Sequence, residues 1–315
     1  MQIKMFLMVG KLKNNKNTDV FGLGQSCWDY IGEIDSYPPP DSKCEMSSII
    51  EVGGGPVATA LIALARWGLR CTFSGVFGDD VYGRQMIADF RDEGVDTSGA
   101  LVRKQASSQL AFIVTEKNTA RRTIFWRRPD GHPPDPAEID FQHLRQSRLF
   151  YTDGLFIDAA VAAARTAREA GIPVIVDAGT LRERSLELTP FSDYYIVARP
   201  FARALTNSDD PRKACLELQK MGPKVVGVTL GEQGSLILNG EEWIETPAYR
   251  VKSLDTTGCG DVFHAGITFG VLQGWSLEKT ADFASWVAAQ VSTKIGGRAG
   301  IPLPEAYDGV YSADH

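Results

Sequence analysis

The amino-acid sequence predicts an α/β protein whose mostly parallel central sheet is covered by helices on both faces. From residue 149 onward, short apolar runs typical of buried strands alternate with longer stretches of helical pattern. Such alternation is typical of parallel strands joined by crossover helices. Two further strand-like regions, at 29–52 and 110–126, do not fit the alternation. We expect them to form a small separate sheet over the carboxyl ends of the central strands, where such folds bind ligands.

The composition is that of an ordinary globular protein. Of 315 residues, 43% are hydrophobic and 23% are charged, which suits one large α/β domain or two smaller ones. The net charge of −6 argues against nucleic acid as a partner, because binding a phosphate backbone needs a basic surface. No apolar run reaches the length of a membrane span, so we expect no membrane partner. The five cysteines are scattered and form no C-x-x-C pair, which favours a reducing cytoplasm.

We expect a single folded domain over residues 19–310. The segment 11–17 is polar and rich in lysine and asparagine, which predicts that residues 1–18 form a disordered extension. The apolar start carries a lysine and lacks a small-residue cleavage site, so it does not resemble a signal peptide.

The expected elements follow in order along the chain. Residues 19–24 predict a first buried strand that ends in glycines. Residues 53–56 (Gly-Gly-Gly-Pro) precede an apolar helical run, and a proline just inside a helix start is well placed. The other expected strands are 28–34, 47–52, 71–76, 149–152, 173–177, 194–197 and 224–230, with a β-hairpin from 110–115 and 122–126; the expected helices are 57–67, 82–93, 158–170, 262–272 and 275–295.

The most informative motif is residues 255–261 (Asp-Thr-Thr-Gly-Cys-Gly-Asp), which directly precede the expected helix 262–272. Residues 258–261 would form the first turn of this helix, where backbone N–H groups have no partner inside the helix. Free N–H groups and the positive end of the helix dipole make an anion site. A carboxylate there, facing a bound phosphate, takes a proton from an attacking hydroxyl, which predicts phosphoryl transfer with Asp261 as the base. For residues 258–261 alone, a tight turn with an acidic cap explains the pattern equally well.

Residues 255–261 resemble the carboxyl-terminal signature of the PfkB/ribokinase family of sugar and nucleoside kinases, D-T-x-G-A-G-D, with Cys259 where the family usually has alanine. Residues 53–60 resemble the family's first signature, a Gly-Gly pair that opens a helix. The resemblance covers nearly all of residues 19–302. It implies a ribokinase-like three-layer α/β/α sandwich with a small β-sheet lid. It also implies ATP-dependent phosphorylation of a hydroxyl, with a primary one favoured, on a small sugar or sugar-like substrate; pentose, ketohexose, keto-sugar acid, sulfonated sugar and nucleoside all stay open as the acceptor.

The resemblance further implies roles for individual residues. It implies Asp261 as the base, with the N–H groups of Gly258, Cys259 and Gly260 at the transferred phosphoryl group; Asp29, Gly53 and Gly54 near the substrate hydroxyls; and Thr229, Gly231, Gly234 and Thr256 at ATP. Asp255 and Thr257 are implied to hold a monovalent cation such as K⁺, or Mg²⁺ through water. ATP and Mg²⁺ are the implied cofactors, and a homodimer that pairs through the lid is the implied assembly.

Four arginines frame the second expected lid strand, at positions 121, 122, 127 and 128. Alternation along a strand places Arg122 and Arg127 on opposite faces. Because a guanidinium grips a carboxylate in two places, we expect Arg127 to contact an anionic group of the substrate. A charged lid edge, or a contact between two copies of the chain, is the alternative interpretation.

The sequence departs from the family pattern at two places. Residues 199–202 (Arg-Pro-Phe-Ala) stand where many members have an N-x-x-E motif that helps organise Mg²⁺, and no carboxylate replaces its glutamate. The asparagine that many members carry near Ala58 is also absent, which argues against ribose or a plain hexose as the substrate.

Two other functions are compatible with the sequence. Without the N-x-x-E motif, the chain is compatible with a sugar or nucleotide sensor of the same fold that has no turnover. Residues 22–24 (Gly-Leu-Gly) approach the dinucleotide fingerprint of a nicotinamide-dependent oxidoreductase, but the third glycine is absent. No Walker A pattern, zinc ligand set or Ser/His/Asp triad occurs, and we expect His264 to be packed rather than catalytic.

Overall fold

The computed structural model describes residues 17–119 and 121–309, and its central feature is an eight-stranded sheet. The strand order is β14-β13-β12-β11-β10-β9-β1-β4, and all neighbours from β12 to β4 are parallel. An antiparallel hairpin completes the sheet at the β12 edge. The strands are β1 (Thr18–Leu23), β4 (Cys71–Ser74), β9 (Ser147–Thr152), β10 (Val174–Ala178), β11 (Tyr194–Ala198), β12 (Val225–Thr229), β13 (Ser235–Asn239) and β14 (Glu242–Thr246).

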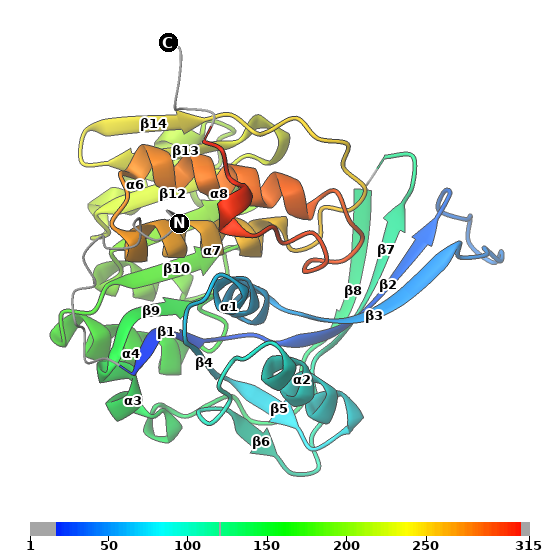
Figure 1. Ribbon diagram of the computed structural model, residues 1–315, viewed down its shortest axis with the longest axis horizontal. Coiled ribbons are helices and arrows are strands. Elements are labelled where there is room, and N and C mark those ends of the chain that lie inside the picture. Colours follow the sequence, from blue (N-terminus) through cyan, green and yellow to red (C-terminus); the bar gives the residue numbers. More distant parts are fainter. Residues whose placement is uncertain (1–16, 120, 310–315) are drawn as a thin grey trace, which may run out of the picture.

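Helices cover both faces of this sheet (Figure 1). One apolar core lies under α1 (Pro56–Arg66), α2 (Val81–Asp92), α7 (Cys259–Gln273) and α8 (Leu277–Val291), and the other lies under α3 (Phe141–Arg145), α4 (Ile157–Glu169), α5 (Arg199–Thr206) and α6 (Pro211–Lys220). Short 3₁₀ helices occur at Pro136–Glu138, Ser185–Phe191, Gly231–Gln233 and Pro304–Ala306. Helix α7 is apolar all round because it packs against α1, α8 and the sheet at once.

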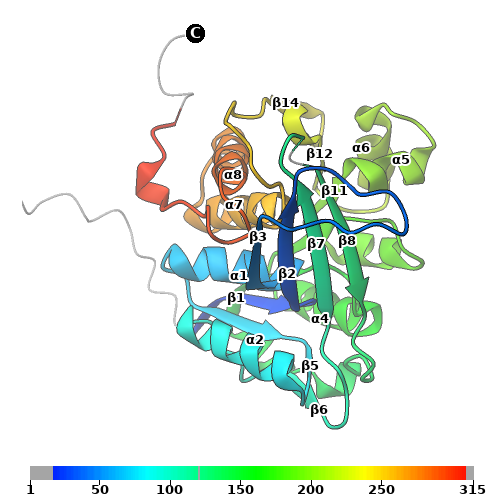
Figure 2. The same cartoon turned by 90° about the vertical axis from the view of Figure 1, so that its right-hand side faces the viewer.

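A second sheet, the lid, consists of four strands in the order β3-β2-β7-β8. These are β2 (Cys27–Ile34), β3 (Ser48–Gly54), β7 (Leu110–Glu116) and β8 (Arg121–Arg127). Figure 1 shows the lid at the right of the layers, and Figure 2 shows it from that side. The chain passes from the carboxyl end of β1 into β2 through residues 24–26, which places the lid at the carboxyl edge of the central sheet. A separate parallel pair, β5 (Val76–Gly78) and β6 (Leu101–Arg103), lies near α2.

The predicted mostly parallel sheet with flanking helices and a small lid is confirmed. Strand β1 starts at Thr18, one residue before the expected start of the domain at 19, and residues 1–16 of the expected extension lie outside the described residues. Strands β13 and β14 were not predicted, because short strands at a sheet edge depend more on packing than on local pattern. Within the described residues, no helix is long and apolar enough to cross a membrane.

Candidate active site

The anion turn, residues 258–261, opens helix α7 at the carboxyl edge of the central sheet. Gly258 caps the helix with φ 74°, and a Cβ there would lie 2.5 Å from the Cα of Gly297, so the turn rests directly on a neighbouring backbone. The first intrahelical bond runs from the Val262 N–H to the Gly258 carbonyl, at 2.9 Å. Earlier N–H groups of the helix therefore have no intrahelical acceptor, as the sequence predicted, and the Cys259 N–H makes a long contact of 3.4 Å with the Thr256 carbonyl before the helix.

Asp261 lies in this first turn, partly accessible to solvent but with its carboxyl group enclosed by protein. Burial, reinforced by the negative charge of Asp177, raises the pKa of Asp261 to about 7, and the Arg122 guanidinium opposes that rise. A carboxyl group with a pKa near neutrality is suited to exchange a proton with a substrate hydroxyl.

A buried polar group lies behind Asp261. Asp177, at the end of β10, accepts a hydrogen bond from the Tyr151 hydroxyl at 3.1 Å and lies 3.5 Å from His264 Nδ1. The same nitrogen lies 2.8 Å from the carbonyl oxygen of Gly260. His264 is packed, as predicted, and its ring supports the backbone of the anion turn from below.

Asp153 is a further buried carboxyl group that the sequence interpretation missed. It accepts hydrogen bonds from the N–H groups of Gln25 (2.8 Å) and Leu155 (2.9 Å), and burial raises its pKa to about 6. Its negative charge also raises the pKa of Asp261. A strand-end aspartate of this kind carries no local motif, and only the folded sheet brings it to the site.

Asp29 lies in β2, with 6% of its surface exposed, at the junction of the lid and the central layers. Its carboxyl group rests against Gly54, where any Cβ would overlap it. A Cβ on Gly53 would overlap the side chains of Asp89 and Arg298. Both glycines therefore make room for protein side chains here.

Arg122 and Arg127 of lid strand β8 lie on opposite faces of the sheet. The ladder aligns Asp29 with Ala111 and Ala111 with Trp126, so that Arg122 shares a face with Asp29. Arg122 Nη1 donates a hydrogen bond to the hydroxyl of Thr256, next to the anion turn. Arg127, the predicted substrate contact, lies on the other face and donates to the Ser108 carbonyl at 3.3 Å. The structure therefore brings Arg122 to the site and leaves Arg127 away from it.

The turn between β12 and β13, residues 229–234, is the segment that the sequence predicts to lie at ATP, and it is called the nucleotide loop for that reason. Thr229 ends β12, and Gly231 and Gly234 have φ values of 63° and 88°. Arg199 Nη2 donates to the Leu230 carbonyl at 3.1 Å and also contacts the Gln233 side chain. Arg199 starts the segment that lacks the N-x-x-E motif, so this departure places a cation beside the nucleotide loop.

Asp255 and Thr257 form a closed turn before helix α7. The fully buried Asp255 carboxylate accepts from the Thr257 N–H (3.0 Å), the Thr257 hydroxyl (2.8 Å) and the Gly296 N–H (2.9 Å). Because the carboxylate accepts these three bonds, it has little remaining capacity to bind a metal ion directly. In the part of the chain that the structure describes, no three His, Cys, Asp or Glu side chains are placed to hold a metal ion together. The residues present suit an ion that arrives with the nucleotide and keeps its water shell.

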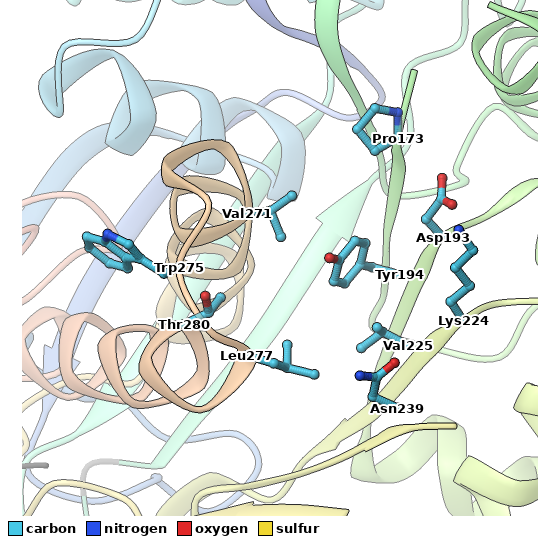
Figure 3. Close-up of a pocket in the computed structure, with 10 residues that line it drawn as sticks. All are labelled: Pro173, Asp193, Tyr194, Lys224, Val225, Asn239, Val271, Trp275, Leu277 and Thr280. Carbon is cyan, nitrogen blue, oxygen red and sulfur yellow. The ribbon is translucent and has the colours of Figure 1, made fainter. Parts of the chain in front are cut away.

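A cavity of about 340 Å³ lies at the opposite, amino-terminal ends of the strands (Figure 3). Tyr194 and Val225, the first residues of β11 and β12, face Val271 and Leu277 across it, whereas the ring of Trp275 points away from the two strands. None of the predicted site residues lines this cavity. A second cavity, of about 410 Å³, lies between the start of α6 and the β12–β13 turn.

A three-layer sandwich with a lid, and with the start of helix α7 at the lid-side edge of the sheet, is the architecture of a ribokinase-like kinase. The chain belongs to the PfkB family: the family described as "pfkB family carbohydrate kinase" matches residues 17–304. It is an ATP-dependent carbohydrate kinase by this membership. Because β1 leads into strand β2 and not into a helix, the dinucleotide-binding alternative is excluded.

The similar proteins include kinases with different acceptors. Fructokinase-2 of Zea mays is 26% identical, covering 91% of this chain and 92% of its own length. Fructokinase-1 of Oryza sativa subsp. japonica is 27% identical, covering 90% and 94%. Among solved structures, adenosine kinase of Sinorhizobium meliloti has a TM-score of 0.77 at 26% identity, covering 89% of this chain and 95% of its own. Ribokinase of Arabidopsis thaliana, complexed with ribose and ATP, has a TM-score of 0.78 at 21% identity, covering 91% and 96%.

Proposed function

We propose that this kinase transfers the γ-phosphoryl group of ATP to a primary hydroxyl of a small sugar or sugar acid. The observation that carries the proposal is Asp261, whose pKa is raised to about 7 in the first turn of a helix, where the N–H groups before Val262 have no intrahelical acceptor. Such a carboxylate takes the proton of the attacking hydroxyl while the new O–P bond forms and ADP leaves. The N–H groups of Gly258, Cys259 and Gly260 stabilise the negative charge on the transferred phosphoryl group.

The remaining residues position the two substrates. Asp29 accepts hydrogen bonds from the acceptor's hydroxyl groups beneath the lid, beside Gly53 and Gly54. Thr229, Gly231, Gly234 and Thr256 surround the phosphates and ribose of ATP. Mg²⁺ bound to the phosphates would neutralise part of their charge, and Asp255 and Thr257 would orient a K⁺ ion or the water around Mg²⁺. Arg122 adds a positive charge beside the anion turn. This charge opposes the rise in the pKa of Asp261 that burial causes.

The relatives include fructokinases and a nucleoside kinase, so their names do not decide the acceptor. The proposed partners are the small acceptor and a second copy of the chain, bound through the lid. Ile49, Phe112 and Phe125, which are 61%, 50% and 57% exposed, lie on the lid face opposite Asp29 and support that assembly. All five cysteines are free, which suits the proposed cytoplasmic location.

The test is ADP release from ATP and Mg²⁺, with and without K⁺, across a panel of sugars, sugar acids and nucleosides. One acceptor that stimulates release in the wild type, and does so far less in Asp261→Asn, would support the proposal. ATP binding without release for any acceptor would favour the sensor alternative.

A further inference from the structure

Arg298 is a buried cation that the proposed mechanism does not use. It lies in the glycine-rich turn 296–300 and is 3% exposed. Its Nη1 forms an ion pair with Asp89 of α2, its Nη2 donates to the Gly54 carbonyl at 3.3 Å, and its Nε lies 3.4 Å from the Thr59 hydroxyl. A buried guanidinium is retained only when it is paired and hydrogen-bonded, and these contacts meet that condition.

The contacts of Arg298 converge on the junction between the lid and helix α1. A Cβ on Gly53 would overlap the Arg298–Asp89 ion pair, and a Cβ on Gly54 would overlap the Asp29 carboxyl group. The guanidinium and the Asp29 carboxyl group therefore pack on adjacent residues of one strand end. A movement of Arg298 would move the backbone against which Asp29 rests.

The two side chains are also linked by charge. Burial raises the pKa of Asp29, Asp255 adds to that rise, and the Cys27 thiol and the Arg298 guanidinium oppose it. Burial lowers the pKa of the Arg298 guanidinium, and the negative charges of Asp89, Asp29 and Glu93 oppose that fall. Asp261 lies close enough for its pKa to be raised by Asp29. Among the charged groups around Asp29, Arg298 is the cation that favours its ionised form.

We propose that Arg298 is a positioning residue: it holds the strand end at Gly54 on which the Asp29 carboxyl group rests and places a positive charge nearby, so that this group can accept hydrogen bonds from the acceptor. The proposal rests on the role of Asp29 in the proposed function. Ionisation matters because a carboxylate offers only acceptor sites, whereas the protonated acid gives one of them up to a donor.

The first test measures the titration of the Asp29 carboxyl group and does not depend on catalytic turnover. The protein is labelled with ¹³C at the aspartate carboxyl carbons, and the Asp29 signal is assigned as the one lost in Asp29→Asn. We expect the titration of Asp29 to move to higher pH in Arg298→Met, since the variant loses the favourable charge but keeps a long side chain. The matched control is Arg66→Met, because Arg66 supports the same turn through the Arg298 carbonyl (2.7 Å) and pairs with Glu93 (2.9 Å) without contacting Gly54.

The control should leave the titration of Asp29 in place even if it lowers stability. An unchanged titration in Arg298→Met, or an equal change in both variants, would overturn the proposal. Failure of the phosphorylation assay alone would not affect this result, because no acceptor is needed.

The variant Asp89→Asn keeps the Arg298 guanidinium and should shift the titration of Asp29 in the opposite direction. Removing the partner carboxylate leaves the Arg298 charge uncompensated, so the titration of Asp29 should move to lower pH. A move to higher pH would contradict the charge link.

For an acceptor found active in the panel, Arg298→Met should raise the KM for that acceptor about tenfold and leave the KM for ATP within about twofold. An equal rise in both KM values would show a general effect on the fold and refute a positioning role.

Discussion

Arg122 of lid strand β8 donates a hydrogen bond to Thr256, the residue two positions before the anion turn. This contact joins the lid to the start of α7, between elements far apart in the sequence. The guanidinium thereby stands beside a site that contains the carboxyl groups of Asp261, Asp177 and Asp153.

Replacing Arg122 with alanine should lower kcat by about 10²-fold, the usual loss for one donor to developing charge in a transition state. Arg121→Ala is the matched control, since alternation turns that residue to the other face of the lid. Steady-state kinetics with both variants makes the comparison. Recovery of Arg122→Ala by added guanidinium chloride would show that the charge itself is required, and equal losses in both variants would contradict the assignment.

Asp261→Asn should keep the fold and ATP binding while turnover falls ~10²–10⁴-fold, the span expected for loss of a general base. Isothermal titration with ATP and single-turnover phosphorylation measure the two effects separately. Near-normal turnover in this variant would remove Asp261 from the mechanism.

The rate should depend on pH through Asp261. Its pKa is raised to about 7, and only the ionised form accepts a proton, so kcat should rise through about pH 7 and level off above it. In Arg122→Lys, which keeps the positive charge, the rise of kcat with pH should stay close to its wild-type position. In Arg122→Ala, this rise should move to higher pH. A flat profile between pH 5 and 9 would argue against the assignment.

The same pKa has a consequence for stability. The carboxyl group binds its proton more tightly in the folded chain, with a pKa of about 7, than at its ordinary value of 3.8. The folded state therefore holds more protons than the unfolded state between these values, and stability is lost as pH rises through them. Asp261→Asn should consequently melt no lower than the wild type at pH 8, and a clearly lower Tm by calorimetry would contradict this.

Gly54→Ala should lose about 1–3 kcal/mol of stability, because its Cβ would overlap the Asp29 carboxyl group. Acceptor binding should weaken more than ATP binding, since the displaced group is Asp29. Gly99→Ala is the control, because a Cβ there would make only ordinary contacts, the nearest at 3.5 Å. Chemical denaturation and the two KM values test this; equal stability of both variants would be the contrary outcome.

The proposed homodimer is tested on the outer face of the lid. Phe125→Asp places a charge among the exposed side chains of Ile49 and Phe112 and should halve the mass found by light scattering. Val102→Asp, at an exposed position in β6 outside the lid, should leave the mass unchanged. A wild-type chain that is already monomeric at micromolar concentration would rule the dimer out.

Local pattern predicted the layers, the lid and the anion turn, because each depends on short-range periodicity or on one motif. The choice between Arg122 and Arg127 needed more than alternation. Alternation separates the two faces of a strand, but only the register against β7 shows which face Asp29 shares, and a slip of one residue would exchange them.

Contacts over long sequence separations were beyond prediction for a similar reason. Arg298 meets Gly54 and Asp89 only after the turn 296–300 has folded onto the lid junction. The glycines at 53 and 54 were recognised as part of a motif, yet the side chains that pack against them became known only from the structure.

The parallel pairing of β2 with β7 also determines when the lid can form during synthesis. Residues 27–34 emerge early, but their neighbour in the sheet is residues 110–116, with α1 and α2 made in between. Such long-range pairing closes late, because a large loop must be ordered before the contact forms. A nascent chain that ends before β7 can build the β1–α1–β4 unit while β2 has only β3 beside it. The surface that would hold the acceptor is therefore completed only after the second lid hairpin has left the ribosome.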